Sequence, residues 1–137
     1  MSEMTVPGGG AGDHEELRAL IQRYARAADE RDIETLALLF HPDAEVTGAR
    51  GAQRISEWLD TMRAPRTFPT SMHMLGEPLI ELEPGADVAV LDTYAVVYQL
   101  GDDGAGLTLG MRYLDEVARR DDRWVFVRRR SVMVWMR

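Results

Sequence analysis

The stretch Thr70-Ser71-Met72-His73-Met74-Leu75 marks the point at which the hydrophobic pattern of this chain changes. Before it, apolar residues recur every three or four positions, which is typical of amphipathic helices. After it, apolar and polar residues alternate, which is typical of strands with one buried face. Three helices followed by a run of strands predict an α+β domain.

The first half of the chain is predicted to be mainly helical. Helices are expected at residues 13–29, 33–40 and 53–62, with a short strand at residues 44–47. Asp13 and Glu16 have the spacing of a capping box, and Asp32 is the expected N-cap of the second helix. Residues 1–12 are rich in glycine and are predicted as a disordered tail, so that residues 13–137 form the single domain.

The second half of the chain is predicted to be a sheet. Strands are expected at residues 72–83, 88–100, 107–118 and 124–135. They are separated by turn signals at Pro84-Gly85, residues 101–106 and Asp121-Asp122, which favour an antiparallel meander. A strongly curved, mostly antiparallel sheet wrapped against three helices is expected to form a cone-shaped α+β barrel with a pocket between the two layers.

Composition excludes several kinds of chemistry. The 137 residues include no cysteine and no lysine, so thiol nucleophiles, disulfides and lysine Schiff bases are ruled out. The net charge of −7 disfavours a nucleic-acid partner, and no apolar run is long enough to cross a bilayer. No secretory signal is evident, so a cytoplasmic location is expected. The three scattered histidines do not have metal-ligand spacing, and no phosphate-binding glycine loop occurs, so these motifs indicate neither a metal site nor a phosphate-bearing cofactor.

His73 is the main candidate for acid/base chemistry. It lies early in the first long strand, whereas His14 and His41 lie at helix ends, where capping explains them. Asp29 ends the apolar face of the first helix, and Tyr24 lies on that face. Imidazole titrates near neutral pH, a carboxylate can orient it, and a phenol can donate to an oxyanion. The structural alternatives are a buried histidine, a helix-end acid and a core aromatic.

Substrate contacts are expected from polar and large side chains of the sheet and third helix. Asp92 and Tyr94 share one face of their strand, where an aspartate in an apolar run needs a partner if that face is buried. The other expected lining residues are Trp58, Met72, Tyr98 and Tyr113.

Three consecutive arginines in the last strand offer a cation to the pocket. By alternation, Arg128 and Arg130 share the face of Trp124 and Phe126, and Arg129 points the other way. An arginine on the concave face could hold an anionic substrate group or pair with an aspartate. The pattern does not choose between Arg128 and Arg130; we take Arg128 as the catalytic candidate.

Several segments carry a resemblance to a known family. They are Tyr24-Ala25-Arg26-Ala27-Ala28-Asp29-Glu30-Arg31-Asp32, residues 39–44, His73 with Leu79-Ile80, residues 112–115, residues 119–124, residues 128–130 and Trp135. In this order they resemble the SnoaL-like group of the nuclear transport factor 2-like superfamily, over nearly the whole chain. The resemblance implies a cone-shaped α+β fold with a deep apolar pocket. Enzymes of the family include scytalone dehydratase, bile acid 7α-dehydratase, hexachlorocyclohexane dehydrochlorinase and polyketide cyclases.

The resemblance also implies a cofactor-free reaction. In the dehydratase-like members an aspartate at the end of the first helix pairs with a strand histidine, and this pattern falls on Asp29 and His73, with Tyr24 as the matching tyrosine. Asp92 and an arginine of residues 128–130 are the nearest matches to further polar residues. We therefore expect a lyase or isomerase acting on a small hydrophobic cyclic substrate, either steroid-like or polyketide-like.

Other functions stay open on the same scaffold. One is a polyketide cyclase, and another is an epoxide hydrolase. Epoxide opening in this superfamily uses an Asp-Arg-Asp arrangement, for which Asp92, Arg112 and Asp115 are available, although Arg112 and Asp115 fall on opposite strand faces. A third is a non-catalytic ligand-binding or accessory subunit. A homo-oligomer, either a dimer or a trimer, is expected because residues 133–135 leave apolar surface to cover.

Overall fold

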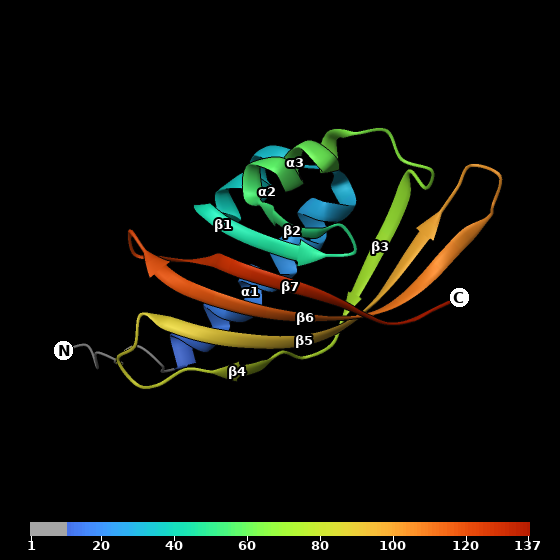
Figure 1. Ribbon diagram of the computed structural model, residues 1–137. Coiled ribbons are helices and arrows are strands. Elements are labelled where there is room, and N and C mark those ends of the chain that lie inside the picture. Colours follow the sequence, from blue (N-terminus) through green and yellow to red (C-terminus); the bar gives the residue numbers. More distant parts are fainter. Residues whose placement is uncertain (1–10) are drawn as a thin grey trace.

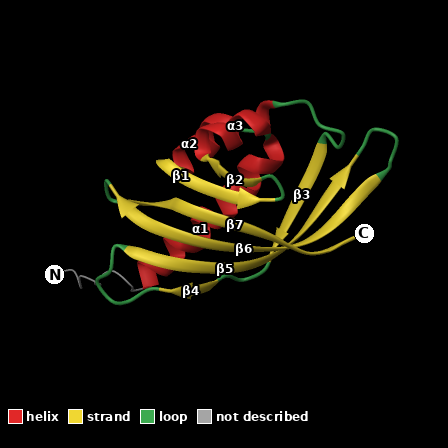
Figure 2. Cartoon of the chain, viewed as in Figure 1, coloured by secondary structure: helices red, strands yellow, loops and turns green. Residues whose placement is uncertain are grey.

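Three helices pack against one face of a curled sheet (Figure 1). The computed structural model describes residues 11–137. The helices are α1 (Ala11–Glu30), α2 (Ile33–Leu39) and α3 (Ile55–Arg63). The strands are β1 (Phe40–Gly48), β2 (Gly51–Arg54), β3 (Thr70–Leu75), β4 (Leu79–Glu81), β5 (Val88–Leu100), β6 (Gly106–Arg120) and β7 (Arg123–Met136). The expected α+β class is confirmed, with the helices before the long strands (Figure 2).

The sheet is mixed and does not close into a complete barrel. Its strands lie in the order β2-β1-β7-β6-β5-β3, and β4 also pairs with β5. All pairings are antiparallel except the parallel pairing of β1 with β7. The parallel pair places the first strand of the chain beside the last. The two edge strands of this order are β2 and β3. The sheet curves between these edges, and the helices lie on its concave side.

The strand predicted at residues 72–83 is in fact two strands, β3 and β4, both paired with β5. Gly76 and Pro78 lie in the interruption between them. Pro78 has no N–H to donate to a strand ladder, which is why a single long strand cannot form here. The N–H of Gly76 instead donates to the carbonyl oxygen of Tyr94 at 2.7 Å, and this contact holds the interruption against the sheet.

The region around β1 and β2 differs most from the prediction. The short strand expected at residues 44–47 is the centre of a longer β1, which begins at Phe40. Strand β2 is not among the predicted strands, because the predicted third helix begins at Gln53, whereas α3 begins at Ile55. Gly51, the first residue of β2, follows the tight turn with a φ of +79°, a conformation that glycine adopts readily.

The start of α1 also differs from the prediction. Asp13 lies inside the helix and not at a cap, and its carboxylate accepts hydrogen bonds from Arg119 Nη2 at 2.6 Å and Trp124 Nε1 at 3.1 Å. Of the predicted tail, residues 1–10 lie outside the described residues, and the next two belong to α1. The N-cap of α2 is confirmed, because Asp32 Oδ1 accepts from the N–H of Thr35 at 3.1 Å.

The core lies between the helices and the concave face of the sheet. The predicted apolar face of α1 is buried, with Leu17, Leu20, Ile21, Tyr24 and Ala28 all at most 5% exposed. It packs with residues of α2, α3 and the sheet in one cluster, in which Tyr24 forms edge contacts with Phe40 and Phe126. Within residues 11–137, no helix has both the length and the apolar character that crossing a bilayer would require.

Candidate active site

The last turn of α1 lies against the start of β3, and this contact brings Asp29 and His73 together. Asp29 Oδ1 is 2.6 Å from His73 Nδ1, and the two side chains are only 18% and 10% exposed. The residues are 44 positions apart in the sequence, so the contact depends on the packing of the helix on the sheet edge. Two of the three predicted acid/base groups therefore form a hydrogen-bonded pair.

The Asp29 carboxylate is held by β3 through further hydrogen bonds. Ser71 Oγ donates to Oδ1 at 2.8 Å, and the backbone N–H of His73 donates to Oδ2 at 2.8 Å. A carboxylate fixed in this way favours the tautomer of His73 that carries its proton on Nδ1. Nε2 of His73 makes no hydrogen bond within residues 11–137, so its lone pair is left available.

The surroundings of His73 favour its neutral form. Burial lowers the pKa of the imidazole below its usual value, although the hydrogen bond and negative charge of Asp29 act in the opposite direction. The positive charges of Arg129 and Arg66 lower this pKa further. A neutral imidazole with a free Nε2 is the state that can accept a proton at neutral pH.

His73 lines a small cavity of about 170 Å³ between the helices and the sheet. Tyr24, Met62, Met111 and Tyr113 are among the residues that form its walls. A larger cavity of about 480 Å³ lies next to it, and the two share Met62, Arg66, Gln99 and Ser131 as lining residues. We call them the inner chamber and the outer chamber. Together they make one candidate site, with His73 on the wall of the inner chamber.

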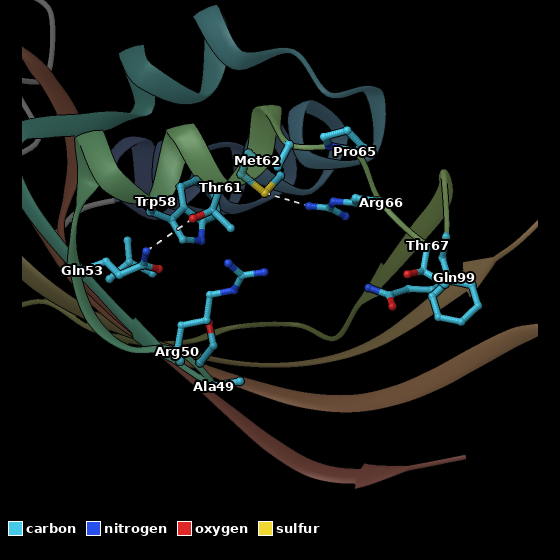
Figure 3. A pocket seen from close by; sticks show the side chains of 15 residues that line it. Ala49, Arg50, Gln53, Trp58, Thr61, Met62, Pro65, Arg66, Thr67 and Gln99 are labelled. Carbon is cyan, nitrogen blue, oxygen red and sulfur yellow. Dashed lines mark hydrogen bonds between the residues drawn. The ribbon is translucent and has the colours of Figure 1, made fainter.

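Three of the aromatic residues predicted for the site, Tyr24, Trp58 and Tyr113, line the two chambers. Trp58 lines the outer chamber (Figure 3) and stacks on Tyr24, with ring centroids 6.3 Å apart. The hydroxyls of Tyr24 and Tyr113 make no hydrogen bond to any described residue. Burial raises the pKa of the Tyr113 phenol, which therefore stays protonated. Both phenols can donate hydrogen bonds to a ligand in the inner chamber.

The prediction that Arg128 faces the pocket is wrong. Arg128 is exposed on the outer face of β7 and pairs with Glu116 at 3.4 Å. The register of β6 and β7 shifts here, because Glu116 pairs with Arg128 but the next residue of β6 pairs with Phe126, so that Val127 is an extra residue. Such a β-bulge reverses the alternation of side chains after it. Arg129, and not Arg128 or Arg130, consequently points inward.

Arg129 is the functional candidate that alternation along the strand missed. It is fully buried, and Nε and Nη2 donate to the two carboxylate oxygens of Asp115 at 2.6 and 2.8 Å. A sequence signal did exist: Asp115 shares the inner face of β6 with Tyr113 and Val117, and a buried acid needs a cationic partner. That requirement points to an inward-facing arginine on the neighbouring strand.

The charge of Arg129 lies directly behind the aromatic wall of the inner chamber. Its guanidinium carbon is 3.8 Å from the ring centroid of Tyr24 and 4.4 Å from that of Tyr113. Burial lowers the pKa of Arg129, but the contact with Asp115 outweighs this effect and leaves the pKa above its usual value. Nη1 is buried and has no hydrogen-bond partner within residues 11–137. The guanidinium of Arg129, in its ion pair with Asp115, thus lies next to the two phenols of the site.

Four predicted substrate-binding residues lie away from both chambers. Met72, Asp92, Tyr94 and Tyr98 are on the outer face of β3 and β5, where they are partly or largely exposed. The inner face of β5 instead carries the alternate residues, which are smaller, because the helices crowd the concave side of the sheet. The expectation that these four side chains line the pocket between the helices and the sheet is therefore wrong.

The Asp-Arg-Asp arrangement considered for epoxide opening is not assembled. Arg112 donates to both oxygens of Asp92 at 2.9 and 2.5 Å on the outer face, whereas Asp115 is buried on the inner face with Arg129. In the part of the chain that the structure describes, no three His, Asp or Glu side chains gather as a group that could hold a metal ion.

Comparisons with solved structures show the same fold. A hexachlorocyclohexane dehydrochlorinase from Novosphingobium barchaimii has a TM-score of 0.81 at 18% identity, over 92% of this chain and 89% of that chain. A Novosphingobium aromaticivorans protein, provisionally named a scytalone dehydratase, has a TM-score of 0.83 at 21% identity, over 92% and 87%. A nuclear transport factor 2-like protein of the same species, with a cystatin-like fold, is 27% identical with a TM-score of 0.75, over 90% and 82%.

Sequence comparison identifies the family. Uncharacterized proteins of Mycobacterium tuberculosis and Mycobacterium bovis are 28% identical over 123 residues, which cover 85% of this chain and 82% of theirs. The profile of the SnoaL-like domain matches residues 11–130. The match covers most of the chain, from the start of α1 to the arginine run of β7, and the chain therefore belongs to the SnoaL-like domain family.

Proposed function

We propose that this protein is a cofactor-independent lyase of the dehydratase type, in which His73 removes a proton from a carbon atom of the substrate. The observation that carries the proposal is the 2.6 Å contact between Asp29 Oδ1 and His73 Nδ1 at the wall of a cavity. The names of two proteins that share the fold, a dehydrochlorinase and a provisional dehydratase, refer to eliminations and give independent support.

The first step is proton abstraction. Nε2 of neutral His73 accepts a proton from a carbon next to a carbonyl group, where the proton is most acidic. The carboxylate of Asp29 stabilises the imidazolium that forms, because it already accepts the Nδ1 hydrogen bond. General acid/base catalysis of this kind contributes about 10²–10⁴-fold to a rate.

The second step is loss of the leaving group. The electron pair of the broken C–H bond forms a C=C bond to the neighbouring carbon, and the hydroxyl group on that carbon departs. The proton held by His73 is returned to this hydroxyl, so that the products are an alkene and water and the enzyme regains its starting state. Tyr24 and Tyr113 donate hydrogen bonds to the enolate oxygen in between, since both side chains line the inner chamber and neither hydroxyl is hydrogen-bonded to a described residue.

The chambers favour a substrate with an apolar ring. Aromatic and thioether side chains, among them Tyr24, Met62 and Met111, form much of the wall of the inner chamber. The buried charge of Arg129 stabilises negative charge that develops on the substrate, although the guanidinium itself lies behind the tyrosine rings. A small cyclic β-hydroxy ketone has the size and chemistry that this arrangement serves.

The proposal is tested by NMR titration of the His73 imidazole in the wild type and in Asp29→Asn. The pKa of His73 is expected to fall in Asp29→Asn, because both effects of Asp29 raise it. Glu30→Gln is the matched control, since it also removes one negative charge, at the next position. The Glu30 side chain is exposed, and its ion pair with Arg26 is long at 4.0 Å. His73→Gln identifies the resonance.

Activity is measured in parallel as dehydration of cyclic β-hydroxy ketones, followed by the absorbance of the conjugated enone. Turnover by His73→Gln is expected to be about 10²-fold or more lower than turnover by the wild type, since the base is lost. Full turnover in His73→Gln, or a His73 pKa that is the same in Asp29→Asn and in the wild type, would overturn the proposal.

A further inference from the structure

The outer chamber has features that a purely apolar substrate would not need. It is formed by the turn after β1, by α3 and by the segment that leads from α3 to β3 (Figure 3). Because the two chambers share lining residues, a ligand too large for the inner chamber has room to extend into the outer one. The chemistry of its lining therefore bears on what the substrate carries at the end remote from the reaction.

Two arginines point into the outer chamber without an acidic partner. Figure 3 shows the guanidinium groups of Arg50 and Arg66 directed into the cavity from opposite sides. Neither pairs with a carboxylate anywhere in residues 11–137, and Arg66 Nη2 donates only to Met62 Sδ, at 2.8 Å. The chain has 23 acidic residues against 16 basic ones, yet none of the described residues that line this cavity is acidic.

A third arginine lies near these two, and the negative charge of Asp29 offsets part of its own charge. Arg31, just after α1, has a buried Nη1 with no hydrogen-bond partner within the described chain. Its Nη2 approaches the carbonyl oxygen of Phe68, a residue of the chamber wall, at 3.5 Å. Burial lowers the pKa of Arg66, and the positive charges of Arg31 and Arg50 lower it further. Like charges that repel one another at the edge of a cavity are stabilised when an anion binds between them.

We propose that the substrate carries an anionic group, either a carboxylate or a phosphate ester, which Arg50 and Arg66 bind in the outer chamber while the apolar ring reaches His73. The position of the ring rests on the proposed function, but binding of the anion does not. Guanidinium groups suit this role because they bind carboxylate and phosphate oxygens through two parallel hydrogen bonds. Trp58 gives the ring an apolar surface between the two chambers.

The test is a calorimetric comparison of three probes: 2-naphthoate, 2-naphthyl phosphate and the neutral 2-naphthamide. They share one apolar ring system and differ in charge. The wild type is compared with Arg50→Gln and Arg66→Gln. Arg130→Gln is the control, because this arginine is also exposed but lies on the outer face of β7, away from the outer chamber.

The anionic probes are expected to bind the wild type at least about tenfold more tightly than 2-naphthamide, since hydrogen bonds to charged groups are among the stronger ones. Arg50→Gln and Arg66→Gln should each weaken binding of the anionic probes by about five- to tenfold and leave the affinity for 2-naphthamide unchanged. The preference of the wild type for anionic probes over 2-naphthamide should shrink as salt is added. Arg130→Gln should change neither affinity. Tighter binding of the phosphate points to a phosphate ester, and tighter binding of the naphthoate points to a carboxylate.

Equal affinity for 2-naphthoate and 2-naphthamide, or an equal loss in Arg130→Gln, would overturn the proposal, as would the failure of both anions to bind at millimolar concentration. The same titrations on His73→Gln separate this proposal from the proposed reaction. Anion binding that persists in His73→Gln supports the anion site whether or not the acid/base pair acts. If 2-naphthamide binds more tightly than the anionic probes while the pKa of His73 still falls in Asp29→Asn, the anion site alone is refuted.

Discussion

The buried ion pair of Arg129 and Asp115 gives the sharpest test of how the sheet supports the site. Both side chains are at most 1% exposed, so in Arg129→Met the Asp115 carboxylate is left without water and without a counter-charge. Removing one partner of such a pair typically costs about 3–5 kcal/mol. A domain of this size is stable by only about 5–15 kcal/mol, so Arg129→Met should remain folded with a large loss of stability.

The assay is urea unfolding followed by circular dichroism, with Arg112→Met as the matched control. Arg112 makes the same two-bond contact with Asp92 on the outer face, but these side chains are 42% and 24% exposed. Water stabilises the charge that remains there, so the control should lose much less free energy of unfolding than Arg129→Met. Equal losses in the two variants would refute the argument from burial.

A double variant separates the buried charge from the packing. Arg129→Met combined with Asp115→Val leaves no unpaired charge, so it should regain most of the stability lost in Arg129→Met. Recovery should be incomplete, because the cation also contacts the rings of Tyr24 and Tyr113. In either variant the pKa of His73 should rise, because the charge of Arg129 lowers it in the wild type. A double variant as unstable as the single one would mean that packing, not charge, dominates.

Three further outcomes follow from the structure. Because burial lowers the pKa of His73, the unfolded chain binds this proton more readily, so the free energy of unfolding should fall as pH drops below about 6.5, and it should fall less in His73→Gln. A Cβ at Gly110 would lie 2.2 Å from Trp135 Nε1, so Gly110→Ala should lower the melting temperature and displace the indole, whereas Gly48→Ala, whose Cβ would have its nearest neighbour at 3.9 Å, should do neither. Tyr94 is 63% exposed on the apolar outer face, and Tyr94→Asp should shift the protein toward monomer in light scattering if that face binds a second copy.

The helical half of the site was predictable because its residues lie on one periodic face. Spacing along α1 predicted that Tyr24 is buried. The contact between Asp29 and His73 could not come from spacing, since 44 residues separate them, and was expected only from the family resemblance. Local pattern thus identified the face of each element, and the contact between elements required knowledge of the fold.

The sheet was harder to predict for two physical reasons. The first is the bulge at Val127, which reverses the alternation that had been extended from Phe126 through the arginine run. The second is that both faces of β5 are largely apolar, so alternation shows which residues share a face but not which face is inside. The larger residues were assigned to the pocket, although a concave face crowded by helices has room mainly for small ones such as Ala95.

The distribution of side chains across the sheet links the site to the outer surface. The inner face buries charged groups, with Arg129 and Asp115 at its centre, whereas the outer face exposes apolar ones such as Tyr94 and Trp135. Burying charges stabilises a fold less than burying apolar groups does, so this arrangement leaves apolar area unused in the single chain. Burial of that area against a second copy would contribute about 25 cal/mol per Å² and stiffen the strands that hold the inner chamber. At high protein concentration, Tyr94→Asp should then have a lower free energy of unfolding than the wild type. At low concentration, where the copies are dissociated, the two proteins should be nearly equally stable. A loss of stability that is the same at every concentration would show that the outer face acts within one chain only.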